Sequence, residues 1–196
     1  MNIPNTISIS RVGILFIFLP LIYYGNIEMK IAAIVLCPVM FLMDYLDGYF
    51  ARKLNMTTQI GSFFDLVGDR ITEIVFWIFF FSLGMVPWWA PTIIILRGFL
   101  SDWTRFRAKS SGKTVYGMMK SPICKFLVCS RIMRGLYGSM KMVLFTLLSI
   151  QFVFSPGLEN IIFYLIVLVI SVNLIRGLPV IYDGRKYLFK KFFIAL

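Results

Sequence analysis

The stretch that decides the fold and chemistry of this chain reads Asp44-Tyr-Leu-Asp47-Gly48-Tyr-Phe-Ala51-Arg52, and it continues after eight residues with Gly61, Asp65 and Asp69. The 196 residues contain only nine Asp and Glu, yet these four aspartates and Glu73 fall within thirty positions of apolar sequence. An acid inside a bilayer costs about 2.5–3.5 kcal/mol even on the lenient insertion scale. Such a concentration of acids therefore predicts a bound cation.

The acids are spaced for two helices that each present a pair of carboxylates. Residues three or four apart share a helix face, so Asp44 and Asp47 project together from one helix, and Asp65 and Asp69 from a second. Carboxylate oxygens are natural ligands of Mg²⁺ or a similar hard cation such as Mn²⁺. We predict a metal site of this kind. The structural alternative, a set of interhelical salt bridges, leaves four acids against one local arginine.

Small residues and an arginine beside the acids suit a bound phosphate. Gly48, Ala51 and Gly61 keep side-chain bulk away from the predicted metal. Arg52 supplies a planar, permanently charged fork that matches phosphate oxygens. The stretch thus favours a buried phosphate or nucleotide next to the cation.

The spacing D-x2-D-G-x2-A-R-x8-G-x3-D-x3-D resembles the signature of the CDP-alcohol phosphotransferase (CDP-alcohol phosphatidyltransferase) family, and all eight fixed positions are present. The resemblance implies a CDP-lipid donor whose diphosphate is bridged by the metal, and a small polar acceptor whose hydroxyl attacks the phosphorus that carries the lipid, with CMP as leaving group. By resemblance the metal ligands are Asp44, Asp47, Asp65 and Asp69, and Asp69 also accepts the proton of the hydroxyl. Family members are commonly homodimers, so a homodimer is implied.

The CDP moiety is expected along three helices. Asn5 and Ser8, in a Pro-Asn segment that opens the first helix, are candidate contacts by resemblance only. The full predicted set is Asn5, Ser8, Gly48, Ala51, Arg52, Thr58 and Gly61.

The composition indicates an integral membrane protein. Apolar residues make up 59% of the chain and aromatic residues 17%, and the mean hydropathy is +0.84. A chain of this length holds about six spans of about 20 residues each. We therefore expect an all-α membrane bundle of about six transmembrane helices, forming one domain over residues 1–196, without room for a soluble domain. The first apolar run lacks a small-residue cleavage site, so we expect no cleavable signal.

Hydropathy and turn signals place the expected spans near 6–24, 31–50, 61–84 and 90–107, then a long fifth span that ends near 154 and a sixth at 158–182. We expect the fifth span to bend around Gly135 and Gly138, because glycines are frequent sources of kinks. Arg11, inside the first span, has two readings: a side chain that snorkels to the interface, or a functional group.

The charge distribution gives an orientation. The net charge is +11, and most loop Lys and Arg fall near 52–53, 105–120 and 185–191, all on one side. By the positive-inside rule, both termini and the acidic site lie on the cytoplasmic side of the cell membrane. The positive charge is therefore attributed to cytoplasmic loops, and we expect no nucleic-acid partner. Histidine is absent, so a general base must be a carboxylate. Cys37, Cys124 and Cys129 read as small hydrophobes.

Several cations lie deep in the later spans. About half of them are expected only to snorkel, and the rest to form an electropositive pocket for a phosphorylated acceptor. The predicted phosphate contacts are Arg131, Arg134, Lys141 and Arg176.

The identity of the acceptor stays open at this point. The opening Asn-Ile-Pro-Asn resembles the family branch that uses glycerol 3-phosphate, whereas Gly68-Asp69-Arg70-Ile71 and Arg105-Phe-Arg107-Ala108 resemble the inositol-phosphate branch. Serine is a further alternative. Outside the enzyme class, a cation-coupled transporter or a lipid-organising structural protein would also hold intramembrane acids. A transporter usually shows repeated halves and a midplane site, whereas these acids lie at one end of their spans.

Overall fold

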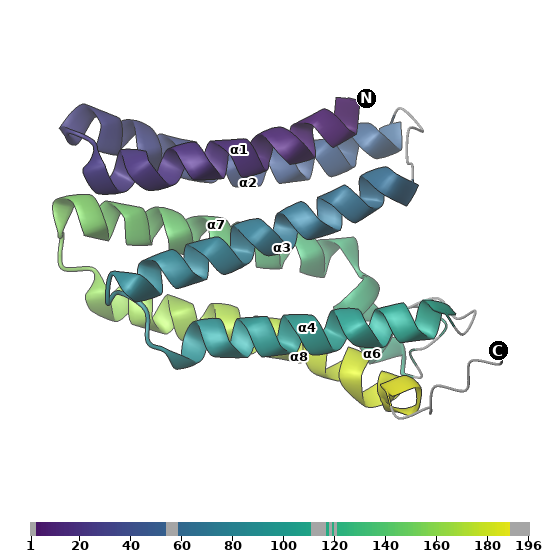
Figure 1. Ribbon diagram of the computed structural model, residues 1–196. Helices are drawn as coiled ribbons and strands as arrows, with labels where there is room; N and C mark the ends of the chain where they lie inside the picture. Colours follow the sequence, from purple (N-terminus) through teal and green to yellow (C-terminus); the bar gives the residue numbers. More distant parts are fainter. Residues whose placement is uncertain (1–2, 54–58, 111–116, 118, 120, 189–196) are drawn as a thin grey trace, which may run out of the picture. The chain divides into compact units, whose positions relative to one another are not determined.

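A computed structural model of the chain describes residues 3–53, 59–110, 117, 119 and 121–188, with side chains left undescribed at 3–9, 44–53, 59–66, 109, 123, 131 and 186–188. The described chain is helical and contains no strand, which confirms the all-α prediction (Figure 1). The helices are α1 (Ile3–Tyr24), α2 (Ile27–Lys53), α3 (Gln59–Ser82), α4 (Trp89–Ser110), α6 (Pro122–Cys129), α7 (Arg131–Phe154) and α8 (Glu159–Leu188).

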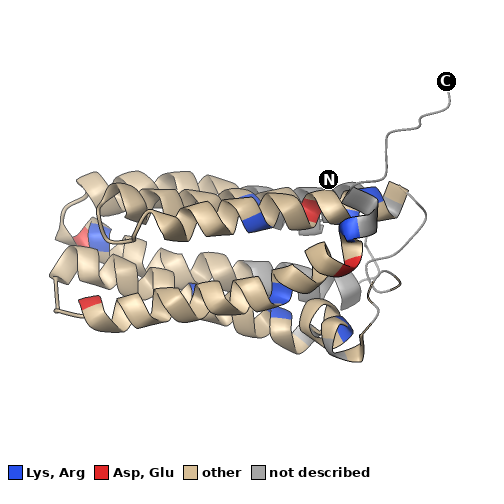
Figure 2. Ribbon diagram, turned by 90° about the horizontal axis from the view of Figure 1, so that it is seen from below, with Lys and Arg blue, Asp and Glu red and all other residues tan. Residues whose placement is uncertain are grey.

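Two of these helices are long and apolar enough to cross a membrane by length and composition. They comprise 23 residues at Ile132–Phe154 and 27 residues at Glu159–Arg185, and Ser10–Tyr24 is a shorter apolar helix. Figure 2 shows long stretches of described helix without any charged residue. Within the described residues, these two helices are consistent with a helical membrane protein.

Helix α2 begins four residues before the expected start at 31. The side-chain Oδ1 of Asn26 accepts a hydrogen bond from the Met29 backbone N–H at 2.9 Å. This is an N-cap, which satisfies one of the donors that a helix start leaves without an intrahelical partner. Glu28 in the first turn adds a favourable interaction with the helix dipole.

The expected long fifth span is divided into two helices, α6 and α7. The helix is interrupted at Ser130, which has φ −61° and ψ 136°, and α7 runs as one helix through Gly135 and Gly138. The Ser130 hydroxyl accepts the Ile132 N–H at 3.2 Å, so serine supplies the cap that a new helix needs. The interruption therefore falls at a serine whose side chain caps the next helix, and both glycines stay inside α7.

The described chain divides into two compact units. The first comprises residues 1–88 and 138–166, and the second comprises 89–137 and 167–196. Helices α7 and α8 each contribute residues to both units. The single domain over 1–196 stays a prediction.

Aromatic rings form the core of the first unit. Helix α1 packs against α2 and α3 (Figure 1). Phe76 of α3 lies 5.1 Å from Phe18 of α1 and 4.8 Å from Phe145 of α7, measured between ring centroids. Trp77 meets Phe145 edge to face at 5.4 Å. Because aromatic pairs prefer such offset and edge arrangements, these rings set how α1, α3 and α7 are rotated against one another.

Candidate functional site

Helices α2 and α3 carry the two acidic pairs to one end of the first unit. Asp44 and Asp47 lie in the second half of α2, and Asp65 and Asp69 in the first half of α3. The two helices run in opposite directions, so the end of α2 and the start of α3 meet at the same end as the start of α1 (Figure 1). The side chains of the first three aspartates lie outside the described residues.

The predicted CDP contacts share that end of the unit. Asn5 and Ser8 belong to the first turns of α1, Gly48, Ala51 and Arg52 to the last turns of α2, and Gly61 to the first turn of α3. Thr58 lies outside the described residues. The topology therefore gathers all the described positions of this set where α1 begins, α2 ends and α3 begins. Their contacts with a nucleotide stay a prediction.

Asp69 is the one predicted metal ligand whose side chain is described. Its Oδ1 lies 2.7 Å from a terminal nitrogen of Arg11 in α1. The Arg11 side chain is 3% exposed and the Asp69 side chain 42% exposed. Arg11 therefore does not snorkel to an interface: it is buried and joins α1 to the acidic motif. The sequence alone left the role of Arg11 undecided. The feature that pointed to a function was a single arginine in an apolar helix, in a chain whose motif holds four aspartates and one arginine.

The donor chemistry fits a hard cation. All four predicted ligands are carboxylates, at helical spacings i, i+3 and i, i+4 on two neighbouring helices, and oxygen ligands are those that Mg²⁺ prefers. The exposure of Asp69 leaves it accessible to an ion. Among the described side chains, no group of three His, Cys, Asp or Glu gathers elsewhere as a metal site.

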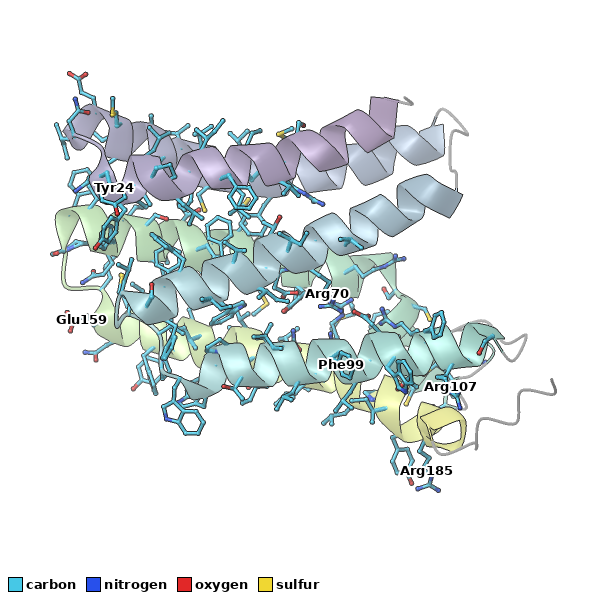
Figure 3. All side chains as sticks on the ribbon, viewed as in Figure 1. Tyr24, Arg70, Phe99, Arg107, Glu159 and Arg185 are labelled. Atoms are coloured by element: carbon cyan, nitrogen blue, oxygen red, sulfur yellow. The ribbon has the colours of Figure 1, made fainter. Side chains whose placement is uncertain are left out.

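Glu73, one turn beyond Asp69, holds two cations. Its Oε2 lies 3.1 Å from Arg70, and its Oε1 lies 3.3 Å from the Lys141 ammonium of α7. The Glu73 side chain is 4% exposed, and Figure 3 labels Arg70 on α3. Lys141 was predicted to bind the acceptor phosphate, and that role stays a prediction. In this structure its ammonium lies against a buried carboxylate, an arrangement that the sequence did not reveal.

A second polar cluster lies in the second unit. The guanidinium of Arg176 in α8 lies over the ring of Tyr137 in α7, 5.2 Å from the centroid. The Asn173 side-chain amide, one turn earlier in α8, donates a hydrogen bond to the Tyr137 hydroxyl. Tyr137 and Asn173 are buried. Tyr137 therefore contacts both Arg176, one of the predicted phosphate contacts, and Asn173, which links α7 to α8 at this point.

Two other predicted phosphate contacts, Arg131 and Arg134, belong to the first turn of α7. A terminal nitrogen of Arg134 donates a hydrogen bond of 3.4 Å to the Cys129 carbonyl, at the end of α6, where cations commonly satisfy the last carbonyl groups of a helix. The side chain of Arg131 lies outside the described residues. Neither observation tests phosphate binding.

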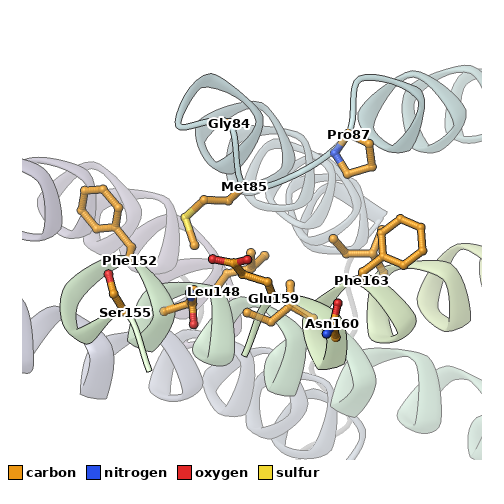
Figure 4. A pocket seen from close by; sticks show the side chains of 12 residues that line it. Gly84, Met85, Pro87, Leu148, Phe152, Ser155, Glu159, Asn160 and Phe163 are labelled. Atoms are coloured by element: carbon orange, nitrogen blue, oxygen red, sulfur yellow. The ribbon is translucent and has the colours of Figure 1, made fainter. Parts of the chain in front are cut away.

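A cavity of about 550 Å³ lies at the opposite end of the first unit (Figure 4). It is lined by the turn after α3, the end of α7 and the start of α8, including Met85, Leu148, Glu159 and Phe163. None of the predicted site residues lines it. The predicted metal ligands lie instead at the acidic end of α2 and α3.

Comparison with known proteins agrees with the motif. The model of the CDP-alcohol phosphatidyltransferase family matches residues 1–172. The chain is 28% identical over 134 residues to the CDP-diacylglycerol–glycerol-3-phosphate 3-phosphatidyltransferase of Bacillus subtilis, which covers 62% of this chain and 69% of that protein. It is 43% identical over 72 residues to the enzyme of the same name from Aquifex aeolicus, covering 36% and 38% of the two chains.

A further relative is a probable phosphatidylglycerophosphate synthase of Mycobacterium tuberculosis, 28% identical over 99 residues that cover 49% of this chain and 47% of that protein. The match of the family model extends over most of the chain and includes the whole acidic motif. The protein therefore belongs to the CDP-alcohol phosphatidyltransferase family of enzymes, as the spacing of its aspartates predicted.

Proposed function

We propose that this protein transfers the phosphatidyl group of CDP-diacylglycerol to a hydroxyl of glycerol 3-phosphate in an Mg²⁺- or Mn²⁺-dependent step that releases CMP. The observation that carries the proposal is the complete aspartate motif, inside a family match over residues 1–172. The choice of acceptor is supported by relatives named for glycerol 3-phosphate.

The donor would bind at the acidic end of α1, α2 and α3. Asp44, Asp47, Asp65 and Asp69 would hold the metal, which supplies positive charge to the diphosphate and to the departing CMP. The guanidinium of Arg52 would bind donor phosphate oxygens. Gly48, Ala51 and Gly61 leave room for the nucleotide because they carry little or no side chain.

The reaction would use Asp69 as the proton acceptor. The hydroxyl oxygen of glycerol 3-phosphate attacks the phosphorus that carries diacylglycerol, a new P–O bond forms, and the P–O bond to CMP breaks with its electron pair on CMP. The proton of the hydroxyl passes to the Asp69 carboxylate, which is exposed enough to be reached. Arg176 would bind the acceptor phosphate. In such transfers, positioning and charge neutralisation supply most of the catalysis.

The protein would act in the cytoplasmic membrane. We propose about six spans with both termini and the acidic site on the cytoplasmic side, on the strength of the loop charges and the positive-inside rule. The two apolar helices at Ile132–Phe154 and Glu159–Arg185 support membrane insertion. A lipid donor in the inner leaflet would there meet a water-soluble acceptor.

An acceptor panel tests the proposal. Detergent-purified protein is mixed with CDP-diacylglycerol and, in separate reactions, with glycerol 3-phosphate, inositol phosphate, inositol or serine, and both CMP and the lipid product are measured. We expect rapid product formation with glycerol 3-phosphate, and none after EDTA treatment. A faster reaction with another acceptor would replace the substrate but keep the enzyme class, whereas absence of CMP release with every acceptor would contradict the whole proposal.

A further inference from the structure

The contact between Arg11 and Asp69 joins the first helix to the predicted reaction centre. The two residues belong to α1 and α3, which pack against each other, and their side chains meet at 2.7 Å. The arginine is almost completely buried while the aspartate keeps 42% of its surface. One side of the carboxylate is therefore anchored in the protein, and the side chain remains open to reactants.

Burial makes this arginine costly to keep. Neighbours of Arg11 on its helix face include Leu15 and Phe18, both fully buried. A charge in such surroundings loses its hydration, and a partner recovers only part of that loss. Replacing a buried ion pair by well-packed apolar residues is often neutral or stabilising, and Phe18 already packs on Phe76 between the same two helices.

We propose that Arg11 is a positioning residue that fixes the orientation of the Asp69 carboxylate. A guanidinium is rigid and planar and binds a carboxylate in few orientations, unlike the compact ammonium of lysine. Asp69 has to face both the metal and the acceptor hydroxyl, so a freely rotating carboxylate would serve neither well. The inference rests on the proposed function, because it takes Asp69 as metal ligand and proton acceptor.

The competing explanation is an ion pair that only stabilises the bundle. The two explanations differ in their effect on metal binding. Removing a positive charge beside a cation site should by electrostatics alone tighten cation binding. Loss of orientation should weaken it, and partners that orient metal ligands typically contribute about 10–100-fold in metal affinity or activity. The direction of the change therefore separates positioning from charge.

The experiment measures binding of Mn²⁺ alone to detergent-purified, substrate-free protein, by electron paramagnetic resonance of the free ion. We expect Arg11→Gln to weaken Mn²⁺ binding about tenfold or more and Arg11→Lys to recover part of this loss. In the Asp69→Asn background Arg11→Gln should cause no further loss, because the carboxylate that it orients is gone. In turnover assays Arg11→Gln should lower kcat while the KM for the CDP-lipid stays near wild type.

Arg70→Gln is a matched control, since it also removes a partly buried guanidinium from an ion pair, but the pair is with Glu73. It should lower the melting temperature and leave Mn²⁺ affinity near wild type. If Arg11→Gln does not fold, Arg11→Lys carries the test, and wild-type Mn²⁺ affinity and kcat in that variant would overturn the proposal. Unchanged or tighter Mn²⁺ binding in a folded Arg11→Gln, or an equal loss in the Asp69→Asn background, would do the same.

Failure of the proposed function has a different signature. The Mn²⁺ measurements contain no lipid and no acceptor, so their outcome does not depend on glycerol 3-phosphate being the substrate. If Arg11→Gln weakens Mn²⁺ binding only when Asp69 is present, and no acceptor supports turnover, the positioning role stands and the proposed reaction is rejected. Normal turnover without coupling between the two residues would reject the positioning role alone.

Discussion

The guanidinium of Arg176 lies over the aromatic ring of Tyr137, 5.2 Å from its centroid, and the same tyrosine hydroxyl accepts a hydrogen bond from Asn173. A cation over an aromatic face is attracted by the ring quadrupole, whose face has a negative electrostatic potential. The arrangement ties a charged group of α8 to α7 and limits the directions in which it can point. This bears directly on the predicted acceptor site.

We expect Arg176→Ala to raise the KM for glycerol 3-phosphate about tenfold to a hundredfold, because a charge-assisted hydrogen bond contributes about 1.5–3 kcal/mol. The KM for CDP-diacylglycerol should stay near wild type, since the proposal assigns donor binding to other residues. Steady-state kinetics with each substrate varied in turn provides the measurement. Unchanged acceptor kinetics would remove Arg176 from the acceptor pocket without affecting the acidic motif.

Replacing Asp44 or Asp65 by Asn should abolish turnover through loss of the metal, because each change removes a charged oxygen ligand from a hard-cation site. The measurement is Mn²⁺ binding together with CMP release over a range of Mg²⁺ concentrations. Glu159→Gln is a matched control: it neutralises an acid at the cavity on the opposite end of the first unit, and should leave both quantities unchanged. Normal Mg²⁺-dependent turnover in Asp44→Asn or Asp65→Asn would reject the metal assignment.

Asp69→Asn should leave binding of the CDP-lipid largely intact while removing turnover. The amide oxygen still coordinates a cation weakly, but it does not accept a proton as a carboxylate does. Equilibrium binding of the donor, measured beside single-turnover CMP release, separates the two effects. Equal loss of binding and turnover would make Asp69 a ligand only.

Glu73→Gln should destabilise the fold more than it changes the chemistry. Glu73 is buried and contacts both Arg70 and Lys141, and removing one partner of a buried ion pair typically costs about 3–5 kcal/mol. Unfolding in detergent micelles provides the measurement. Asp102→Asn is the control, because Asp102 forms a longer i, i+3 pair with Arg105 at 3.8 Å, and such pairs contribute only about 0.2–1 kcal/mol. Similar losses in both variants would show that the Glu73 pairs are not special.

Gly177→Ala should destabilise the second unit by about 1–3 kcal/mol through overpacking. An added Cβ would lie 2.8 Å from Cγ and 2.9 Å from Cδ of the buried Arg97. Gly135→Ala in α7 is the control, since nothing lies within 4 Å of its added Cβ and alanine favours a helix by about 1 kcal/mol over glycine. Thermal unfolding of both variants should therefore shift in opposite directions. A stabilising Gly177→Ala would contradict the close packing of α8 against Arg97.

The start of α2 and the interruption at Ser130 differ from the helices expected from the sequence. The expected helices lay close to the observed ones because their apolar length is a local property. Asn26 and Ser130 shifted the outcome because their side chains cap helix ends, which competes with hydropathy over only a few residues. The interruption of the fifth span falls at Ser130, and Gly135 and Gly138 lie inside α7.

The sequence by itself determined the helical class and the family, because apolar length and the spacing of the aspartates are both encoded within short stretches of chain. Only the tertiary structure decided which cation meets which acid. Arg11 pairs with Asp69, and Lys141 with Glu73, across helices far apart in sequence. Those pairings depend on how α1, α3 and α7 are rotated, and the packing of Phe18, Phe76 and Phe145 sets that rotation.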